Sequence, residues 1–272
     1  MIKLSHPDYF LPVVHALEPG KIFDTGTTAP QLVRGVCEQT GTKSDYVVKY
    51  IKGQRMSAEA SCRELLAAYI AAELEFNVPE PALINISSDF TELLRGSDNY
   101  QTAVNSIGFN FGNKYEEGYQ QIMVGQHIDD KLNAKLVELL AFDIFIGNAD
   151  RRLDKPNFMS NGDDILIFDH ELAFGFTLEL PFLRNPKPWI IRDSDMEWIK
   201  NNFCFVRLKG RDLKMDNFIN KLSAINDDFW VKYQNIAPAE WLTDQVKDIK
   251  EYLQKLIDKS DIFESEIKRI LL

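Results

Sequence analysis

The chain has 272 residues, of which 45% are apolar and 26% charged, an ordinary composition for a folded protein of one large domain or two lobes. Its net charge of −10 argues against a general nucleic-acid binder, because such proteins usually carry a basic face. The three cysteines, Cys37, Cys62 and Cys204, show no C-x-x-C spacing, which argues against a disulfide framework and against a structural zinc site.

The start of the chain has no basic stretch followed by an apolar core, so we expect no secretory signal there. The longest apolar stretches, residues 65–74 and 136–146, are short and interrupted by carboxylates, so we expect no membrane span. Together these features predict a cytoplasmic protein that does not bind membranes.

In chain order, the first predicted element is a hairpin of residues 32–37 and 46–51, which are rich in β-branched residues and separated by turn-forming ones. Residues 57–76 repeat apolar side chains at helical spacing and are predicted to form a helix. Residues 81–86 and 120–124 read as two further strands.

The second half begins with a strongly periodic helix, predicted for residues 129–146, with an aspartate available as its N-cap. A polar loop follows, and then two short apolar runs, residues 158–159 and 165–168. The Asn161-Gly162 pair between these runs predicts a second hairpin. The rest of the chain is predicted to be mostly helical, most clearly over residues 241–272.

This order of elements predicts an α+β fold with two lobes. A β-rich N-terminal lobe of residues 1–125 would hold one helix, and residues 126–272 would form a mostly α-helical C-terminal lobe. The cleft between two lobes is the usual place for a ligand.

Three polar side chains around the second hairpin suggest a chemistry. Asp150 and Asn157 lie in the polar loop before it, and Asp169 follows its apolar second strand, so the hairpin brings the three together. Phosphoryl transfer needs a carboxylate that orients the attacking hydroxyl, together with carboxylate and amide oxygens that hold Mg²⁺. We therefore predict that Asp150 orients the hydroxyl and that Asn157 and Asp169 are the metal ligands.

The motifs around these residues resemble those of the HipA-like protein kinases, especially the short members with a single kinase domain. The second half contributes three motifs: Asn148-Ala-Asp150-Arg151, Asn157-Phe-Met159 and Asp169-His170. The first half contributes four: Thr25-Gly-Thr-Thr28, Asp45-Tyr-Val-Val-Lys49, Glu64 on the following helix, and Asn77-Val-Pro-Glu80 at its exit.

The resemblance implies a bilobal protein-kinase-like fold that uses ATP and Mg²⁺ to phosphorylate serine or threonine, often on a protein. It also implies that Gly26, Thr27 and Thr28 lie over the phosphates, that Lys49 binds them, and that Glu64 orients Lys49. Some relatives belong to toxin–antitoxin or stress systems, which implies an antitoxin or regulatory protein as a partner. Some relatives are also phosphorylated in the threonine-rich loop.

Three positions depart from the family pattern: Arg152 stands where many relatives have His, Lys155 where many have Asn, and Glu171 where Gly is common. These departures keep open a second interpretation, a pseudokinase-like binding module. A third is a kinase of a small cationic molecule, which acidic cleft residues around Asp98, Glu116 and Glu117 would suit, although such charges are usually found in solvated loops.

Each of these candidate site residues could also have a purely structural role. Lys49 could be a solvent-facing strand lysine, Glu64 a surface helix residue, Asp150 a loop cap and Asn157 a loop-closing amide. Asp169 is harder to explain structurally, because a charge beside buried strand residues is costly unless it is paired or metal-bound. His170 is expected to be a hydrogen-bonded structural residue.

Overall fold

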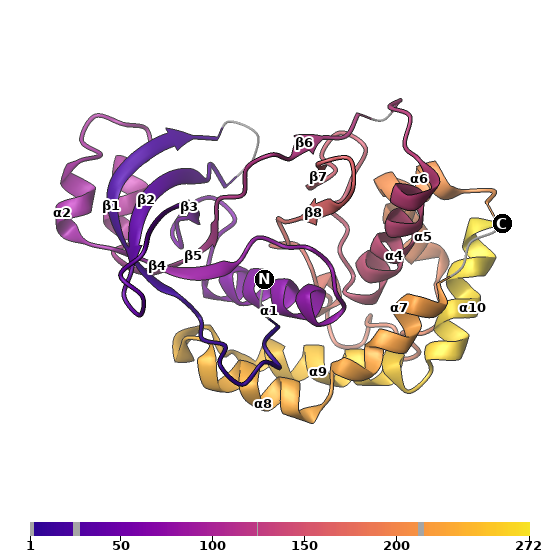
Figure 1. Cartoon of the computed structure of the whole chain (residues 1–272). Helices are drawn as coiled ribbons and strands as arrows, with labels where there is room; N and C mark the ends of the chain where they lie inside the picture. Colours follow the sequence, from indigo (N-terminus) through magenta and orange to yellow (C-terminus); the bar gives the residue numbers. More distant parts are fainter. Residues whose placement is uncertain (1–2, 24–27, 124, 212–214) are drawn as a thin grey trace.

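The computed structural model describes residues 3–23, 28–123, 125–211 and 215–272. Strands gather in the N-terminal half and helices in the C-terminal half, with the barrel and the helical part side by side (Figure 1). This mixed α/β arrangement is consistent with a kinase-like fold and agrees with the predicted order of elements. Within the described ranges, no helix has the length and apolar character needed to cross a membrane.

Five strands of the N-terminal half close into a barrel in the order β1-β2-β3-β5-β4. They are β1 (Val13–Ile22), β2 (Gln31–Cys37), β3 (Lys43–Lys49), β4 (Pro81–Ile86) and β5 (Gly108–Lys114). All neighbours are antiparallel except β1 and β4, which run parallel. The structure confirms the predicted β2–β3 hairpin and the strand β4, whereas β1 and β5 were not predicted.

The barrel encloses its own apolar core, which two short helices, α2 (Ser88–Glu92) and α3 (Tyr100–Asn105), help to cover. Phe90 of α2 and Ala103 of α3 are buried in this core together with side chains of β1, β2, β3 and β4. Among the strands, the inward-facing residues include Val14, Val33, Val48 and Ile84.

Helix α1 (Ala58–Glu73) lies between the barrel and the helical part (Figure 1). Ser57 caps its start by accepting a hydrogen bond from the backbone N–H of Ala60 at 3.2 Å. Nearly every residue of the helix is buried, so its charged side chains need partners inside the protein. Because α1 touches both parts, its acidic and basic residues can reach a site between them.

The loop that contains Asp150 and Asn157 lies between helix α4 and strand β7, which follow the barrel in the chain. Helix α4 (Asp130–Phe145) starts at its N-cap Asp129, as predicted. Strands β7 (Phe158–Ser160) and β8 (Ile165–Ile167) form the predicted hairpin, and β6 (Gln120–Gln121) adds a third strand beside β7. The strand predicted at 120–124 is thus limited to two residues in the described part, and Val124 lies outside the described residues.

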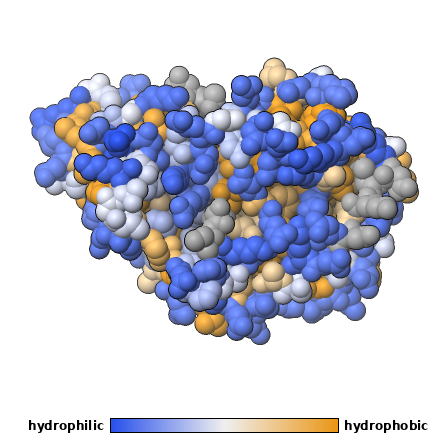
Figure 2. Space-filling view, in the orientation of Figure 1, coloured by the Kyte–Doolittle hydropathy of each residue, from blue (hydrophilic) through white to orange (hydrophobic). Residues whose placement is uncertain are grey.

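The remaining chain is mostly helical, as predicted. Its helices are α5 (Asp193–Ile199), α6 (Phe203–Leu208), α7 (Asp216–Lys221), α8 (Asp227–Ile236), α9 (Asp244–Ile257) and α10 (Ser260–Leu271), with 3-10 turns at Gly175–Thr177, Leu222–Ala224 and Ala239–Trp241. They share one large apolar core with α1 and α4. The surface is mostly hydrophilic on the face in Figure 2, with a few apolar patches.

The core therefore falls into two clusters, one inside the barrel and one that joins α1 to the C-terminal helices. Helix α1 belongs to the second cluster although it lies early in the chain. The division into lobes of residues 1–125 and 126–272 remains a prediction.

Candidate active site

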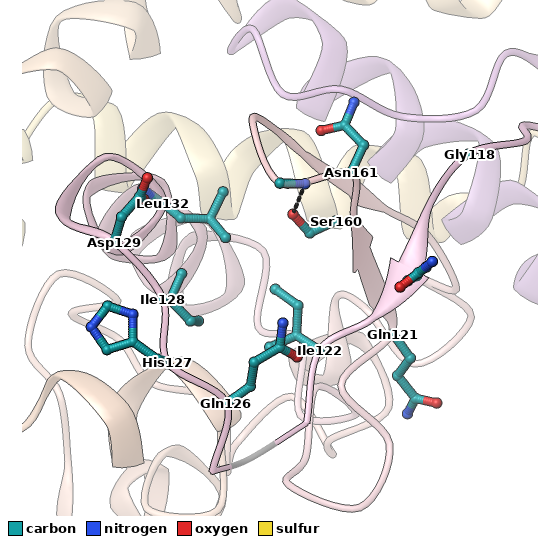
Figure 3. A pocket seen from close by; sticks show the side chains of 12 residues that line it. Gly118, Gln121, Ile122, Gln126, His127, Ile128, Asp129, Leu132, Ser160 and Asn161 are labelled. Carbon is teal, nitrogen blue, oxygen red and sulfur yellow. Dashed lines mark hydrogen bonds between the residues drawn. The ribbon is translucent and has the colours of Figure 1, made fainter.

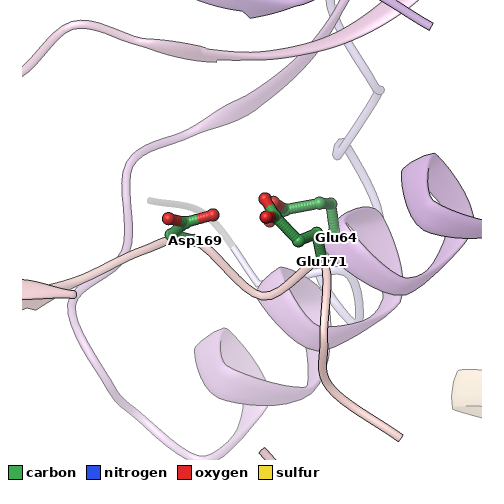
Figure 4. Close-up of side chains that lie close together, drawn as sticks. All are labelled: Glu64, Asp169 and Glu171. Carbon is green, nitrogen blue, oxygen red and sulfur yellow. The ribbon is translucent and has the colours of Figure 1, made fainter. Parts of the chain in front are cut away.

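Four segments that are far apart in the sequence meet at one acidic site. They are the end of β3 with Lys49, helix α1 with Glu64, the loop after α4, and the segment after β8 with Asp169 and Glu171. Figure 4 shows the carboxyl groups of Glu64 and Glu171 close together and that of Asp169 beside them. The barrel thus contributes Lys49, helix α1 contributes Glu64, and the chain that follows the β7–β8 hairpin contributes Asp169 and Glu171.

The Lys49 ammonium lies at the centre of the three carboxylates. It donates hydrogen bonds to Glu64, to Asp169 at 2.5 Å and to Glu171 at 2.9 Å. An ammonium carries three N–H donors, so all of them are engaged. The side chain is 8% exposed, and burial of this kind requires such partners. A solvent-facing strand lysine is therefore excluded.

The loop after α4 places Asp150 and Asn157 in direct contact. The side-chain amide of Asn157 donates to the backbone carbonyl of Asp150 and to its carboxylate, both at 3.2 Å. The Asn157 Oδ1 accepts no hydrogen bond from the described residues. Because the amide N–H groups face Asp150, this carbonyl oxygen is the atom left for a cation.

Lys155 connects this loop to the end of β8. Its Nζ lies 3.1 Å from Asp150 Oδ2 and 2.7 Å from Asp169 Oδ2. The backbone N–H of Phe168 also donates to the carbonyl of Asn157 at 3.2 Å. The polar loop and the carboxylate after β8 are therefore adjacent, and the loop faces the same site as Lys49.

A second group of buried polar side chains supports the loop from behind. Arg151 and Asp143 form an ion pair of 2.7 Å with no exposed surface, and Asn148 and Asn202 donate to the same carboxylate. Arg151 also donates to the backbone carbonyls of Pro156 at 3.1 Å and of Asn157 at 2.6 Å. These contacts fix the backbone on which Asp150 and Asn157 stand.

Two site residues have backbone conformations that are uncommon for residues other than glycine. Asn157 has φ of 50° and Asp169 has φ of 64°, both in the left-handed region. Conformations of this kind persist where the surroundings enforce them, and they concentrate at functional sites. Here they turn the two side chains toward the same site.

Burial and charge shift the pKa values of the site in opposite directions. Burial would raise the pKa of Asp169, but the ammonium groups of Lys49 and Lys155 hold it below its ordinary range. Burial raises the pKa of Glu171 to about 7, against the effect of Lys49 and with the help of neighbouring Asp169. Asp169 is therefore a stable anion, whereas Glu171 is protonated at a much higher pH than an exposed glutamate.

The acidic residues suit a hard cation. One ligand oxygen from each of Glu64, Asp169 and Glu171 can lie within 4.8 Å of the others, and carboxylate and amide oxygens are what Mg²⁺ prefers. The Oε1 of Glu171 is buried and has no hydrogen-bond partner among the described residues. The pairing of Asn157 with Asp169 as metal ligands stays a prediction, and the carboxylates that lie near Asp169 in this cluster are those of Glu64 and Glu171.

The predicted phosphate loop is described only in part. Gly26 and Thr27, with Thr25, lie outside the described residues. Thr28 is buried just before β2, near the turn that follows β3. The acids Asp98, Glu116 and Glu117 are exposed on the surface and do not take part in the acidic cluster.

A cavity of about 500 Å³ lies beside β6, the start of α4 and the turn between β7 and β8 (Figure 3). Its lining is largely polar and includes Gln121, Gln126, His127 and Asn161. None of the described site residues lines it. The acidic cluster borders a much smaller cavity of about 10 Å³, which Glu64, Asp169 and Phe111 line.

The site contains three contributions besides the predicted residues. Glu171, which the sequence leaves open as a further carboxylate near the metal, contacts Lys49, and Lys155, noted only as a departure, contacts Asp150 and Asp169. Asp143 stood out only as an interruption of an apolar helix, which is the signal that a buried acid needs a partner. His170 is buried against Phe142, with ring centroids 6.0 Å apart, and its backbone N–H donates to Glu64 at 2.8 Å. Its ring differs from the prediction of a hydrogen-bonded side chain, because the buried Nε2 has no hydrogen-bond partner among the described residues.

A family model described as HipA-like kinase matches residues 23–265, which is most of the chain and includes all the residues of the site. The chain belongs to the HipA-like kinase family. The comparison with curated proteins gave no match. Membership of the HipA-like kinases supports phosphotransfer as the activity, and it implies ATP and a divalent metal as the cofactors.

Proposed function

We propose that this HipA-like kinase is a bilobal, Mg-ATP-dependent serine/threonine kinase that phosphorylates a protein. The observation that carries the proposal is the contact network that joins Asp150, Asn157 and Asp169 through Lys155. A hydroxyl-orienting carboxylate beside an amide and a carboxylate suited to a metal is the minimum set for phosphoryl transfer.

The nucleotide would lie between the barrel and the helical part, with Lys49 against its phosphates and Glu64 holding Lys49 in place. Gly26, Thr27 and Thr28 would cover the phosphates, as the family resemblance implies. Lys49 must then exchange at least one of its carboxylate partners for a phosphate oxygen, because its three donors are already engaged.

The acceptor hydroxyl would donate its hydrogen bond to the Asp150 carboxylate. Its oxygen forms a bond to the γ-phosphorus while the bond from that phosphorus to the β–γ bridging oxygen breaks. The proton passes to Asp150 and the electron pair leaves on ADP. A magnesium ion on Asn157 and Asp169 would supply charge neutralisation on the phosphate oxygens.

The proposal is tested by Asp150→Asn and Asp169→Asn, each compared with the wild type for transfer of labelled γ-phosphate to itself or to proteins of a native lysate. We expect both to lose transfer by at least about 100-fold, as removal of a group that acts in the transition state does. Asp163→Asn, an exposed acid paired with Lys131, is the matched control and should transfer normally. Unchanged transfer in both site variants would overturn the assignment of roles.

One observation favours a second candidate, a nucleotide-binding module without turnover. Ammonium groups contact both oxygens of Asp169, so a metal must displace one of them. Binding of Mg-ATP without transfer to any protein would favour this candidate. In both cases we propose a protein as the binding partner, a substrate in the first and an antitoxin-like or regulatory protein in the second, in the cytoplasm.

A further inference from the structure

Lys155 bridges the two carboxylates to which the proposed reaction assigns different roles. Its ammonium contacts Asp150, the predicted hydroxyl-orienting group, and Asp169, a predicted metal ligand, at 3.1 and 2.7 Å. In phosphoryl transfer the moving group passes between the attacking and the leaving oxygen, while the metal binds oxygens of the same phosphates. An ammonium held by both carboxylates is therefore next to the path of that group.

The backbone holds Lys155 in this position. Its carbonyl accepts a hydrogen bond from the backbone N–H of Arg152 at 3.1 Å, and the carbonyls of the next two residues accept from the buried guanidinium of Arg151. The loop on both sides of Lys155 is thus tied to the interior. The part of Lys155 that reaches the site is its side chain, whose ammonium contacts the carboxylates of Asp150 and Asp169.

The two lysines of the site, Lys49 and Lys155, differ in how many of their N–H donors are already bonded to carboxylates. Lys49 has three carboxylate partners and an 8% exposed side chain, whereas Lys155 has two partners and a 22% exposed side chain. An ammonium carries three N–H donors, so the contacts of Lys155 with the described residues leave one donor for a ligand. It is therefore the lysine better placed to meet a phosphate oxygen that enters from solvent.

The charge of the site also fits a role for this lysine. Four carboxylates, those of Glu64, Asp150, Asp169 and Glu171, face two ammonium groups, so the acids of the site outnumber its bases even when Glu171 is protonated. Without Lys155 the site would repel the phosphates of a nucleotide more strongly.

We propose that Lys155 is a catalytic residue that binds the transferring γ-phosphoryl group, after resting on Asp150 and Asp169 when no nucleotide is bound. This inference rests on the proposed function. It gives a role to a residue at which the chain departs from the family pattern, and it predicts that this lysine distinguishes a nucleoside triphosphate from a diphosphate.

The test measures binding rather than turnover. Calorimetry in Mg²⁺ compares ADP with a non-hydrolysable ATP analogue for the wild type, Lys155→Met and the control Lys131→Met. Lys131 is exposed and pairs with Asp163 outside the site, so its variant removes the same charge elsewhere. A charged hydrogen bond lost at Lys155 should weaken triphosphate binding about 10- to 100-fold and diphosphate binding less than about threefold.

Several results would overturn the inference. Equal loss of both nucleotides would give Lys155 a structural role, and unchanged affinities would give it no role in binding. Tighter triphosphate binding would show that the ammonium only competes with the metal. If the wild type binds neither nucleotide, the proposed function fails and the inference fails with it, whereas normal transfer with unchanged discrimination in Lys155→Met sinks the inference alone.

A second measurement uses the wild type and so does not depend on the folding of a variant. An ATP derivative with an acyl group on its γ-phosphate transfers that group to lysine amines nearby, and peptide mapping identifies the lysine. We expect Lys155 to be acylated and to be protected by excess Mg-ATP. Acylation of Lys49 without Lys155 would overturn the inference.

Discussion

Two buried groups of charged side chains lie on opposite sides of the same loop, and they are built differently. Behind the loop, Arg151 and Asp143 are completely buried, and two asparagines and two backbone carbonyls complete most of their hydrogen bonds. In front of the loop, four carboxylates share two lysines, and part of the group reaches solvent.

The difference separates a structural charge cluster from a functional one. The Asp143–Arg151 cluster has one acid for one base and fixes a backbone. The cluster in front has an excess of acids and side chains that can change partners, which suits a site that must accept a cation and phosphates. Burial of charge alone would not have distinguished them.

The largest expected effect lies in the Asp143–Arg151 cluster. Arg151→Met leaves the Asp143 carboxylate buried without its cation, so we expect it to lower the free energy of unfolding by about 3–5 kcal/mol. Denaturant unfolding measures this loss. The double variant Asp143→Leu/Arg151→Met should recover much of it, and a loss under about 1 kcal/mol in the single variant would contradict a structural role.

Binding of Mg-ATP should have the next largest effect on the free energy of unfolding, and this effect should depend on the acidic cluster that contains Asp169. Mg-ATP at 100 times its dissociation constant should stabilise the wild type by about 2.7 kcal/mol. Chelation of the metal with EDTA should remove most of that stabilisation, and Asp169→Asn should not show it. Thermal unfolding with and without each component checks this, and equal stabilisation of Asp169→Asn would speak against a metal on Asp169.

Glu171 should make stability depend on pH. Burial raises its pKa from the usual 4.5 to about 7, so the folded state favours the protonated form. Its contribution is then complete below about pH 4.5 and is lost as the pH rises through about 7. Relative to Glu171→Gln, the wild type should lose about 2 kcal/mol between pH 4.5 and pH 8.

This is measured by unfolding both proteins in EDTA without nucleotide across that range of pH. Subtracting the two curves removes the contributions of the other titrating groups. A difference that stays constant with pH would mean that Glu171 is ionised throughout.

The smallest effect is expected at an exposed ion pair. Lys131 and Asp163 contact each other at 3.3 Å with both side chains mostly exposed, so Lys131→Met should change stability by no more than about 0.5 kcal/mol. Chemical denaturation checks this value. A larger change would make Lys131 unsuitable as a control.

The sequence predicts the elements whose signals are local. Helices α1 and α4 combine apolar periodicity with the caps Ser57 and Asp129, and the β7–β8 hairpin has its Asn-Gly turn. Strand β5 was hidden because glycine and asparagine are typical of loops. Gly112 is needed there, since a Cβ would lie 2.5 Å from Ile84 Cγ1, a contact between strands that no local pattern reveals.

The sequence predicts that Asp150, Asn157 and Asp169 come together, and the structure joins them in one contact network, whereas their catalytic and metal-binding roles remain predictions. The contacts of Lys155 could not be predicted, because they depend on how the hairpin folds back and on the conformation of one long side chain. Glu171 shows the same limit, since its partner Lys49 comes from a strand 122 residues away.

The closure of the barrel has a consequence for recognition. Each of its five strands has a hydrogen-bonded neighbour on both sides, but β1 meets β4 only over residues 13–15, so among the described residues much of β1 has a neighbour on one side alone. Another chain could continue the sheet there. Where the strands are paired on both sides, a docking protein must be selected by loops and side chains, which can change during evolution without disturbing the barrel.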